Sequence, residues 1–360
     1  MNLVDRVRGC VLWGAIGDVL GAPIEFQSLE RLRQTYGPDG VADLVWHESG
    51  RLGAITDDTQ MTLFTIEGLI RSRGREVPAA VHAAHRRWYG TQMLSGPPEG
   101  GGPQRLATGD VVIMDGALAG RRWLYARRAP GNACLSGLRF GRMHTPDHPA
   151  NPDSKGCGAV MRSAPFGLNP AWSPERAFDL AAVCGVQTHG HPSGHLAAGA
   201  FAAITRHLLD DLDLEEAVRR VLDHLGSRDG GRETHDALRT ALQAAEEGTP
   251  SAERLEELGA GWVAEEALAM SVYCALVHPG DIRAALLLAV NHSGDSDSTG
   301  AITGNLLGVR HGEAGIPEAW ALALEGRETM LGLADDFVRA VTDGHPEDPA
   351  WLERYPPQST

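Results

Sequence analysis

Apolar residues recur every three or four positions along most of this chain, and this pattern limits the fold more than any other feature. Such spacing places apolar side chains on one face of an α-helix. Alternating runs of β-branched residues with hairpin signals are scarce. The sequence therefore predicts an all-α fold rather than an α/β fold. The apolar stripes occupy residues 3–16, 61–69, 178–186, 196–209, 214–225, 237–245, 264–277, 282–290, 302–309 and 329–341.

The breaks between these stripes are predicted to be loops within one domain. Residues 95–109 are rich in Gly and Pro, residues 145–153 are rich in Pro, and residues 226–233 form a charged connector. None of them resembles a long flexible linker between independent domains. We therefore expect residues 1–360 to form one compact single-domain helical bundle, with a loose tail from about residue 344.

The charge and the cysteine content argue against several functions. A formal net charge of -15 repels phosphate backbones and disfavours a nucleic-acid partner, although backbone N–H groups or cations can still bind a nucleotide. The five cysteines form no CxxC pair, which argues against a disulfide framework and a zinc ribbon. The apolar runs, such as residues 284–290, are too short to span a bilayer, and no signal peptide is evident. We expect a cytoplasmic protein without a membrane partner.

A first acidic cluster, Thr56-Asp57-Asp58-Thr59, stands at the start of an apolar stripe. A threonine that caps a helix, followed by two aspartates in the first turn, is what the helix macrodipole favours. The same carboxylates could instead bind a metal ion. The cluster alone leaves both interpretations open.

A second acidic cluster lies at residues 291–300, with Asp295 and Asp297 at alternate positions. Carboxylates spaced in this way lie on one side of an extended loop, as a hard cation requires. An EF-hand is excluded because its twelfth position would be Leu306 rather than a glutamate. A solvated turn remains the alternative.

Together the two clusters supply four carboxylates and several hydroxyl groups, without a thiolate. This donor set suits Mg²⁺ or Mn²⁺ rather than Zn²⁺. Four aspartates brought together without a cation would repel one another and raise each other's pKa. Two divalent ions about 3.5–4 Å apart would relieve that repulsion and are a common device for hydrolysis.

Three further segments have both a structural and a functional interpretation. Glu25 follows an apolar stretch and is either a partly exposed helix end or a general base close to a metal. The small-residue loop 154–162 could let phosphates approach backbone N–H groups. His189, His191 and His195 lack a fourth ligand at a suitable spacing, so a zinc site is disfavoured.

Taken in order, these segments resemble the ADP-ribosylglycohydrolase family. The TDDT and GDxD elements in this order, on helical surroundings, are highly specific, whereas either alone would be only suggestive. The resemblance covers nearly the whole chain, through GAIGDVLGAPIEF (14–26), ITDDTQM (55–61), PGNACLS (130–136), SKGCGAVMR (154–162), THGHP (188–192), EEALAMSVYCAL (265–276) and NHSGDSDSTGAITGNLLG (291–308).

The resemblance implies an all-α bundle around a central binuclear site that holds two Mg²⁺ or Mn²⁺ ions. A carboxylate would accept a proton from a metal-bound water or assist the leaving group. The implied catalytic carboxylates are Glu25, Asp57, Asp58 and Asp297. The implied metal ligands are Thr56, Asp57, Asp58, Asp295, Asp297 and Ser298, the last of which is often Thr in the family. The implied ADP-ribose contacts are Asn132, Ser154, Gly156, Gly158 and His189.

One departure from the family concerns the linkage that is cleaved. An arginine-specific member of the family carries an aspartate three residues before the asparagine near the proximal ribose, and here that position is Ala129, preceded by Arg127 and Arg128. A guanidinium leaving group would lose a partner, and it would meet cations if the two arginines face the pocket rather than solvent. Only a carboxylate from elsewhere, such as Asp110 or Asp115, could replace the missing aspartate. We therefore expect an O-linked, serine-type bond to be cleaved in preference to an arginine-linked bond.

The predicted function is magnesium-dependent hydrolysis of the glycosidic bond between ADP-ribose and a protein side chain, by a monomer. The alternatives are a hydrolase of a free ADP-ribose derivative or of ADP-ribosylated nucleic acid, and a non-catalytic ADP-ribose-binding or toxin-immunity protein. The net charge of -15 weighs against nucleic acid. A non-catalytic relative need not keep the ligand set, and all six positions carry oxygen donors here, which favours catalysis.

Overall fold

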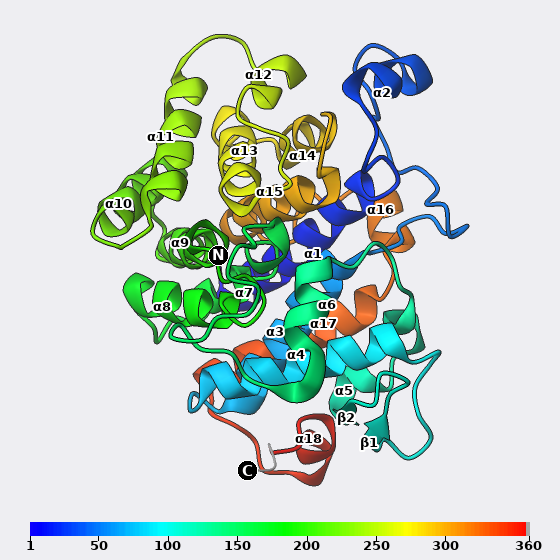
Figure 1. Cartoon of the computed structure of the whole chain (residues 1–360). Coiled ribbons are helices and arrows are strands. Elements are labelled where there is room, and N and C mark those ends of the chain that lie inside the picture. Colours follow the sequence, from blue (N-terminus) through cyan, green and yellow to red (C-terminus); the bar gives the residue numbers. More distant parts are fainter. Residues whose placement is uncertain (358–360) are drawn as a thin grey trace.

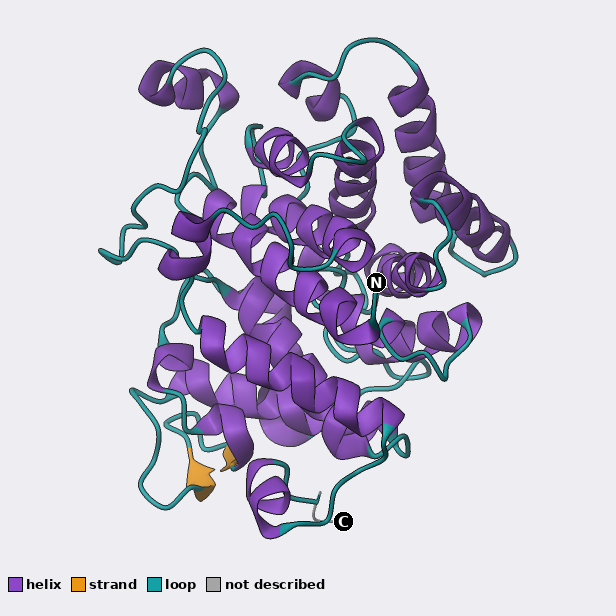
Figure 2. Cartoon of the chain, turned by 180° about the vertical axis from the view of Figure 1, so that it is seen from behind, coloured by secondary structure: helices purple, strands orange, loops and turns teal. Residues whose placement is uncertain are grey.

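The computed structural model describes residues 1–357. Over these residues the regular secondary structure is helical except for one small hairpin of strands (Figures 1 and 2), which confirms the predicted all-α fold. Not one helix in this part of the chain combines the length and the apolarity that crossing a membrane requires. In chain order the elements are α1 (Leu3–Gly21), α2 (Leu29–Tyr36), α3 (Asp57–Ser72), α4 (Val77–Met93), β1 (Gly102–Arg105), β2 (Val111–Met114), α5 (Gly116–Ala119), η1 (Arg122–Tyr125), α6 (Asn132–Leu138), η2 (Arg139–Gly141), η3 (Cys157–Ala159), α7 (Ala164–Gly167), α8 (Pro174–Gly185), α9 (Pro192–Leu209), α10 (Leu214–Gly226), α11 (Arg232–Glu246), α12 (Ala252–Glu256), α13 (Ala264–Val277), α14 (Ile282–Val290), α15 (Ser296–His311), α16 (Glu318–Ala323), α17 (Arg327–Thr342) and α18 (Pro349–Arg354).

Helices α1 and α15 pack against each other at the centre of the molecule (Figure 1). Their backbones approach so closely that a Cβ atom at Gly17 would collide with the carbonyl oxygen of Gly300. One turn further along, a Cβ atom at Gly21 would collide with the backbone of Ser296. Glycine has no Cβ and permits this approach. As a result, the end of α1 and the beginning of α15 lie side by side.

The remaining helices surround this central pair. In Figure 1, α10–α14 lie in the upper part of the view, and α3, α4, α5 and α18 lie in the lower part. One continuous apolar core joins the two groups, and its largest buried side chains include Trp13 on α1, Trp88 on α4 and Phe201 on α9. The shared core makes the described chain a single domain, as predicted.

The Gly/Pro-rich segment 95–109, predicted as a loop, contains β1. This strand pairs antiparallel with β2, with Gly102 opposite Met114. Val112 and Met114 alternate with exposed neighbours and are buried, and Gly90 of α4 packs closely against Met114. Burial of one face of β2 against α4 therefore stabilises a hairpin that the glycines and prolines of the segment did not indicate.

The tail that was expected to be loose from about residue 344 carries a helix, α18, in its described part. Trp351 and Tyr355 of this segment are almost completely buried, and the Tyr355 hydroxyl donates to Asp336 at 2.8 Å. Burial of two aromatic side chains gives this segment a tertiary anchor, so the structure differs here from the expectation. The last residues of the predicted tail, 358–360, lie outside the described part.

Candidate active site

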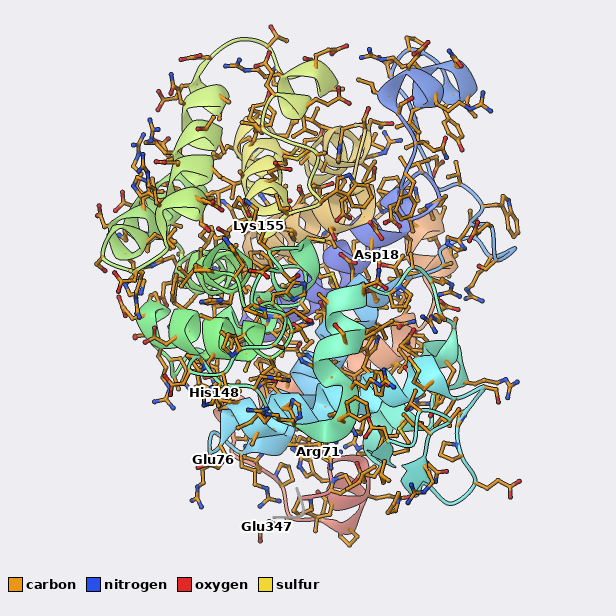
Figure 3. The ribbon with its side chains drawn as sticks, in the orientation of Figure 1. Asp18, Arg71, Glu76, His148, Lys155 and Glu347 are labelled. Atoms are coloured by element: carbon orange, nitrogen blue, oxygen red, sulfur yellow. The ribbon has the colours of Figure 1, made fainter. Side chains whose placement is uncertain are left out.

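The end of α1 and the beginnings of α3 and α15 meet near the middle of the molecule, where Figure 3 labels Asp18. Asp18 belongs to α1 and is fully buried. Its Oδ2 accepts hydrogen bonds from the N–H groups of Thr56 at 3.0 Å and Thr59 at 3.2 Å, and the Thr59 hydroxyl also donates to it. Asp18 thus satisfies first-turn N–H groups of α3 from a neighbouring helix.

The capping interpretation of the first acidic cluster describes its backbone correctly. Thr56 is the N-cap of α3, and its Oγ1 accepts from the N–H of Asp58 at 3.3 Å. The same turn buries Asp57 and Asp58 at the edge of a cavity. Among the described residues, Oδ1 of Asp58 is buried without a hydrogen-bond partner. Helix capping therefore explains the position of the two aspartates and leaves buried carboxylate oxygen free for another ligand.

The second acidic cluster is not a solvated turn, because Asp295 and Asp297 are each only 3% exposed. Asp295 is the N-cap of α15, and its own N–H donates to the carbonyl oxygen of Ala260 at 2.9 Å. Asp297 Oδ1 accepts from the N–H of Ser298 at 3.0 Å. The loop before α15 is thus tied to a distant segment, and its carboxylates lie beneath the surface.

Five carboxyl groups crowd together here, and burial works against their ionisation. One oxygen from each of Glu25, Asp295 and Asp297 lies within 4.8 Å of the others. Burial, reinforced by repulsion from Asp297, raises the pKa of Glu25 to about 10 and that of Asp57 to about 8. Burial and neighbouring carboxylates likewise hold the pKa of Asp58 well above its usual range. Divalent cations would allow these groups to ionise together.

The donor set fits a hard cation such as Mg²⁺ or Mn²⁺, because the side chains gathered here offer carboxylate and hydroxyl oxygens. A thiol also reaches the site, since Cys157 Sγ donates to Asp295 Oδ2 at 2.8 Å. Burial raises the pKa of Cys157 well above its usual range and keeps it protonated. Cys157 therefore acts as a hydrogen-bond donor to a carboxylate rather than as a thiolate ligand.

The carboxylates line a cavity of about 350 Å³. Segments far apart in the sequence meet around it, and it gathers eleven of the twelve residues predicted for the site. Thr56 is the exception, because it lines a smaller adjoining cavity. The predicted residues that line the larger cavity are Glu25, Asp57, Asp58, Asn132, Ser154, Gly156, Gly158, His189, Asp295, Asp297 and Ser298.

His189 is held rigidly at the wall of this cavity. The Thr188 hydroxyl lies 2.8 Å from His189 Nδ1 and accepts from Arg162 Nη2 at 2.6 Å. Burial, with the positive charge of Arg162, lowers the pKa of His189 to about 3, so the ring is neutral. A Cβ atom at Gly158 would lie 2.9 Å from the ring, so glycine is needed there for packing. His191 has a separate role, since it caps α9.

Two features in and beside the cavity could not be assigned a role from the sequence. Asp18 was visible as a charge within an apolar stretch, and the structure shows that it braces α3. Phe26 and Trp262 are 70% and 40% exposed, line the cavity, and stack with their ring centroids 5.2 Å apart. These two aromatic residues lie far apart in the chain, so the sequence alone could not indicate that their rings stack.

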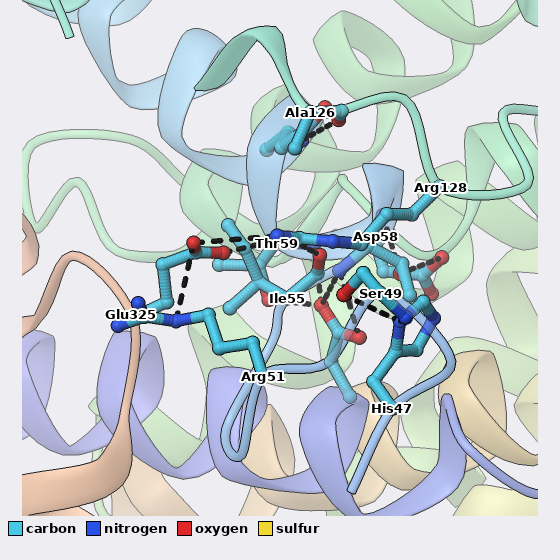
Figure 4. Close-up of polar contacts among 12 residues, drawn as sticks. His47, Ser49, Arg51, Ile55, Asp58, Thr59, Ala126, Arg128 and Glu325 are labelled. Atoms are coloured by element: carbon cyan, nitrogen blue, oxygen red, sulfur yellow. Dashed lines mark hydrogen bonds and ion pairs between the residues drawn. The ribbon is translucent and has the colours of Figure 1, made fainter. Parts of the chain in front are cut away.

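The two arginines before Ala129 have different environments. Arg128 is buried, donates to Glu325 Oε2 at 2.5 Å, and also donates to the carbonyl oxygen of Ile55 at 2.6 Å (Figure 4). The charge of Arg128 is therefore compensated, and its hydrogen bond positions Ile55, the residue that precedes Thr56. Arg127 is exposed.

Neither aspartate suggested as a replacement for the missing carboxylate reaches the site, so that suggestion is wrong. Asp110 pairs with Arg86 at 2.6 Å, and Asp115 pairs with Arg71 at 2.8 Å. Figure 3 shows Arg71 in the lower part of the molecule, well away from Asp18. Each of these aspartates is instead neutralised by a buried arginine of α3 or α4.

Comparison with known proteins places this all-helical domain with its acidic cavity in a family. The profile described as ADP-ribosylglycohydrolase matches residues 1–347, so the chain belongs to the ADP-ribosylglycohydrolase family. The ADP-ribosyl-(dinitrogen reductase) glycohydrolase of Rhodospirillum rubrum is 26% identical over 89% of this chain and 90% of its own. The ADP-ribosylarginine hydrolase Tri1 of Serratia proteamaculans is 24% identical over 93% of this chain and 79% of its own. A solved structure titled ADP-ribosylglycohydrolase-related protein complex superposes with a TM-score of 0.66 at 26% identity, covering 94% of this chain and 99% of that one.

Proposed function

We propose that this protein hydrolyses the glycosidic bond between ADP-ribose and a protein side chain, with the help of two divalent cations, Mg²⁺ or Mn²⁺. The observation that carries the proposal is the cluster of buried carboxylates in a cavity that is also lined by Asn132, Ser154 and His189. The relatives named above act on ADP-ribosylated proteins, which supports a protein substrate. We take the protein to work as a cytoplasmic monomer.

The residues divide into those that would hold cations and those that would hold substrate. Asp57, Asp58, Asp295 and Asp297, with the hydroxyls of Thr56 and Ser298, would hold the cations. Bound cations would orient the ribose and lower the pKa of an attacking water. The neutral ring of His189 and the loop at Gly156 and Gly158 would bind the diphosphate and distal ribose. Glu25, whose carboxylate lies close to those of Asp295 and Asp297, would accept the proton that the attacking water loses.

We further propose that an O-linked bond is preferred to an arginine-linked bond. Ala129 lines the cavity and offers no carboxylate to a guanidinium group. The charge of Arg128 is balanced by Glu325, whereas Arg127 lines the adjoining smaller cavity, so the missing carboxylate and the charge of Arg127 both disfavour a guanidinium. One relative is an ADP-ribosylarginine hydrolase, which makes the arginine linkage the necessary comparison.

Release of ADP-ribose from serine- and arginine-modified peptides, measured side by side, tests these proposals. We expect release in saturating Mg²⁺ or Mn²⁺, faster from the serine peptide, and none after exhaustive chelation. Full activity in chelated protein would overturn the role of cations, and a clear arginine preference would overturn the proposed linkage. Binding of ADP-ribose without release from either peptide or from a free ADP-ribose ester would instead favour a non-catalytic binding protein.

A further inference from the structure

A second, smaller cavity of about 160 Å³ adjoins the first. Glu25, Phe26 and Ala129 line both cavities and therefore form the boundary between them. Beyond this boundary, the polar lining of the smaller cavity comprises His47, Glu48, Thr56, Arg127 and Arg128. The residues predicted to contact ADP-ribose line the larger cavity instead.

The boundary between the two cavities is conformationally strained. Phe26 and Ala129 adopt left-handed backbone conformations, with φ of 68° and 46°. Such a conformation costs a residue with a side chain about 1 kcal/mol or more. Strain of this kind persists where the surrounding structure fixes a residue and is concentrated at functional sites. Here the two strained residues form part of the boundary between the larger and the smaller cavity.

The hydrogen bonds of a short hairpin determine the state of the His47 ring. Trp46 and Leu52 form an antiparallel bridge, and the N–H of His47 donates to Arg51 at 3.1 Å. The N–H of Ser49 donates to His47 Nδ1 at 3.0 Å (Figure 4). A backbone N–H can only donate, so Nδ1 is an acceptor and the neutral ring carries its proton on Nε2. Within residues 1–357, the structure shows no acceptor for that Nε2–H.

The neutral form of His47 is the one to expect at neutral pH. Burial, with the nearby charge of Arg128, lowers the pKa of His47 below its usual value. The ring thus offers a fixed N–H donor to the smaller cavity that it lines.

We infer that the smaller cavity, which we name the target-side chamber, receives the residue from which ADP-ribose is removed, and that His47 Nε2–H donates a hydrogen bond to the linking oxygen. This inference rests on the proposed function. If ADP-ribose fills the larger cavity with its anomeric carbon at the carboxylates, the departing residue must lie on the other side of Glu25 and Ala129. At about 160 Å³ against about 350 Å³, the chamber suits a side chain rather than a nucleotide.

The hydrogen bond would assist one defined event in the hydrolysis. The bond between the anomeric carbon and the side-chain oxygen breaks, the water oxygen bonds to that carbon, and the proton lost by the water ends on the departing oxygen. A donor aimed at this oxygen stabilises the negative charge that develops on it. A guanidinium carries only donors and would gain nothing from Nε2–H, so it would depend on Glu48.

The test is to compare His47→Ala with His47→Gln, which keeps an N–H donor close to the position of Nε2. We expect His47→Ala to lower kcat on the serine-linked peptide by at least about tenfold, and His47→Gln to retain most of the wild-type rate. Free ADP-ribose lacks the target residue, so the rise in Tm that it causes should be the same in both variants and in the wild type. His148→Ala is the matched control, because His148 is exposed and distant from the site (Figure 3).

Three results would overturn the inference. A wild-type rate for His47→Ala would show that the ring does not contact the leaving group. A parallel loss of ADP-ribose binding would place His47 in the nucleotide cavity or in the fold. A loss of activity in Glu48→Gln together with a preference for arginine-linked peptide would identify a guanidinium as the occupant. If the wild-type protein cleaves neither peptide, the proposed function itself fails, and the inference fails with it.

Discussion

Two regions of this molecule bury several charged groups, and they balance those charges in opposite ways. Between α3, α4 and β2, each buried arginine meets a carboxylate, as in the pairs Arg86–Asp110 at 2.6 Å and Arg87–Glu67 at 2.8 Å. At the meeting point of α1, α3 and α15, none of the five carboxylates that line the larger cavity has an ion-pair partner among the described residues. These are Glu25, Asp57, Asp58, Asp295 and Asp297.

The contrast separates a structural cluster from a functional one. A buried arginine with its own carboxylate is complete within the protein, and removing one partner leaves an unpaired buried charge. Buried carboxylates without a cation are incomplete, and the protein keeps them at a cost in stability. A group of charges that the fold does not neutralise is thus the better indicator of a bound ligand.

Asp297→Asn should give the largest effect, because it removes a charge from the unpaired region. We expect the rate in saturating Mg²⁺ to fall by at least about a hundredfold, as when a group that stabilises developing charge is removed. In chelator, Tm should stay the same or rise, since one source of repulsion is gone. Asp57→Asn should behave in the same way. A near wild-type rate in either variant would remove that residue from the proposed ligand set.

Glu67→Gln should show the opposite behaviour, because it unbalances the paired region. Glu67 is fully buried and pairs with Arg87. Losing one partner of a buried pair costs about 3 kcal/mol in the free energy of unfolding. We expect urea denaturation to show this loss while kcat of the folded protein is unchanged. A loss below about 1 kcal/mol would mean that water or Asp115, which lies 3.6 Å from Arg87, takes over the pairing.

Glu325→Gln should affect the site without removing a cation ligand. The ion pair between Glu325 and Arg128 is neutralised within the protein, but it also positions the backbone next to the site. Glu325 holds Arg128, and Arg128 holds the carbonyl oxygen of Ile55 next to Thr56. We expect the Mg²⁺ concentration for half-maximal activity to rise by about tenfold, with kcat at saturating Mg²⁺ largely retained. Glu313→Gln, in the partly exposed pair with Arg8, is the control and should leave both quantities unchanged. An unchanged Mg²⁺ requirement in Glu325→Gln would limit Arg128 to a structural role.

The pH dependence of metal-free stability should be the smallest effect. In the native state the pKa values of Asp18, Asp57 and Glu25 are raised to about 7, about 8 and about 10. Unfolded carboxyl groups titrate near about 4, so between these values the native state binds more protons and stability falls as pH rises. We expect Tm in chelator to be a few degrees lower at about pH 9 than at about pH 6. Mg²⁺ should restore more stability at the higher pH, and a Tm that rises with pH in chelator would contradict this account.

Much of the candidate site could be predicted because its chemistry is local in the chain. The TDDT turn and the alternate aspartates 295 and 297 show oxygen donors within a few residues of each other, and helical periodicity shows that both stand at helix beginnings. The same local reasoning offered Asp110 and Asp115 as spare carboxylates. It could not show that Arg86 and Arg71 already hold them.

The sequence by itself determined the helical architecture and the set of side chains able to hold a hard cation, because period, caps and ligand spacing are properties of neighbouring residues. Tertiary structure alone decided which charges are neutralised. Gly17 and Gly300 bring α1 and α15 close enough to gather the carboxylates, and Glu325 reaches Arg128 across almost two hundred residues. Tertiary structure also places the hairpin that carries His47 so that it lines a second cavity together with Glu25. Burial and pairing depend on what packs against a side chain, and those neighbours come from distant parts of the chain.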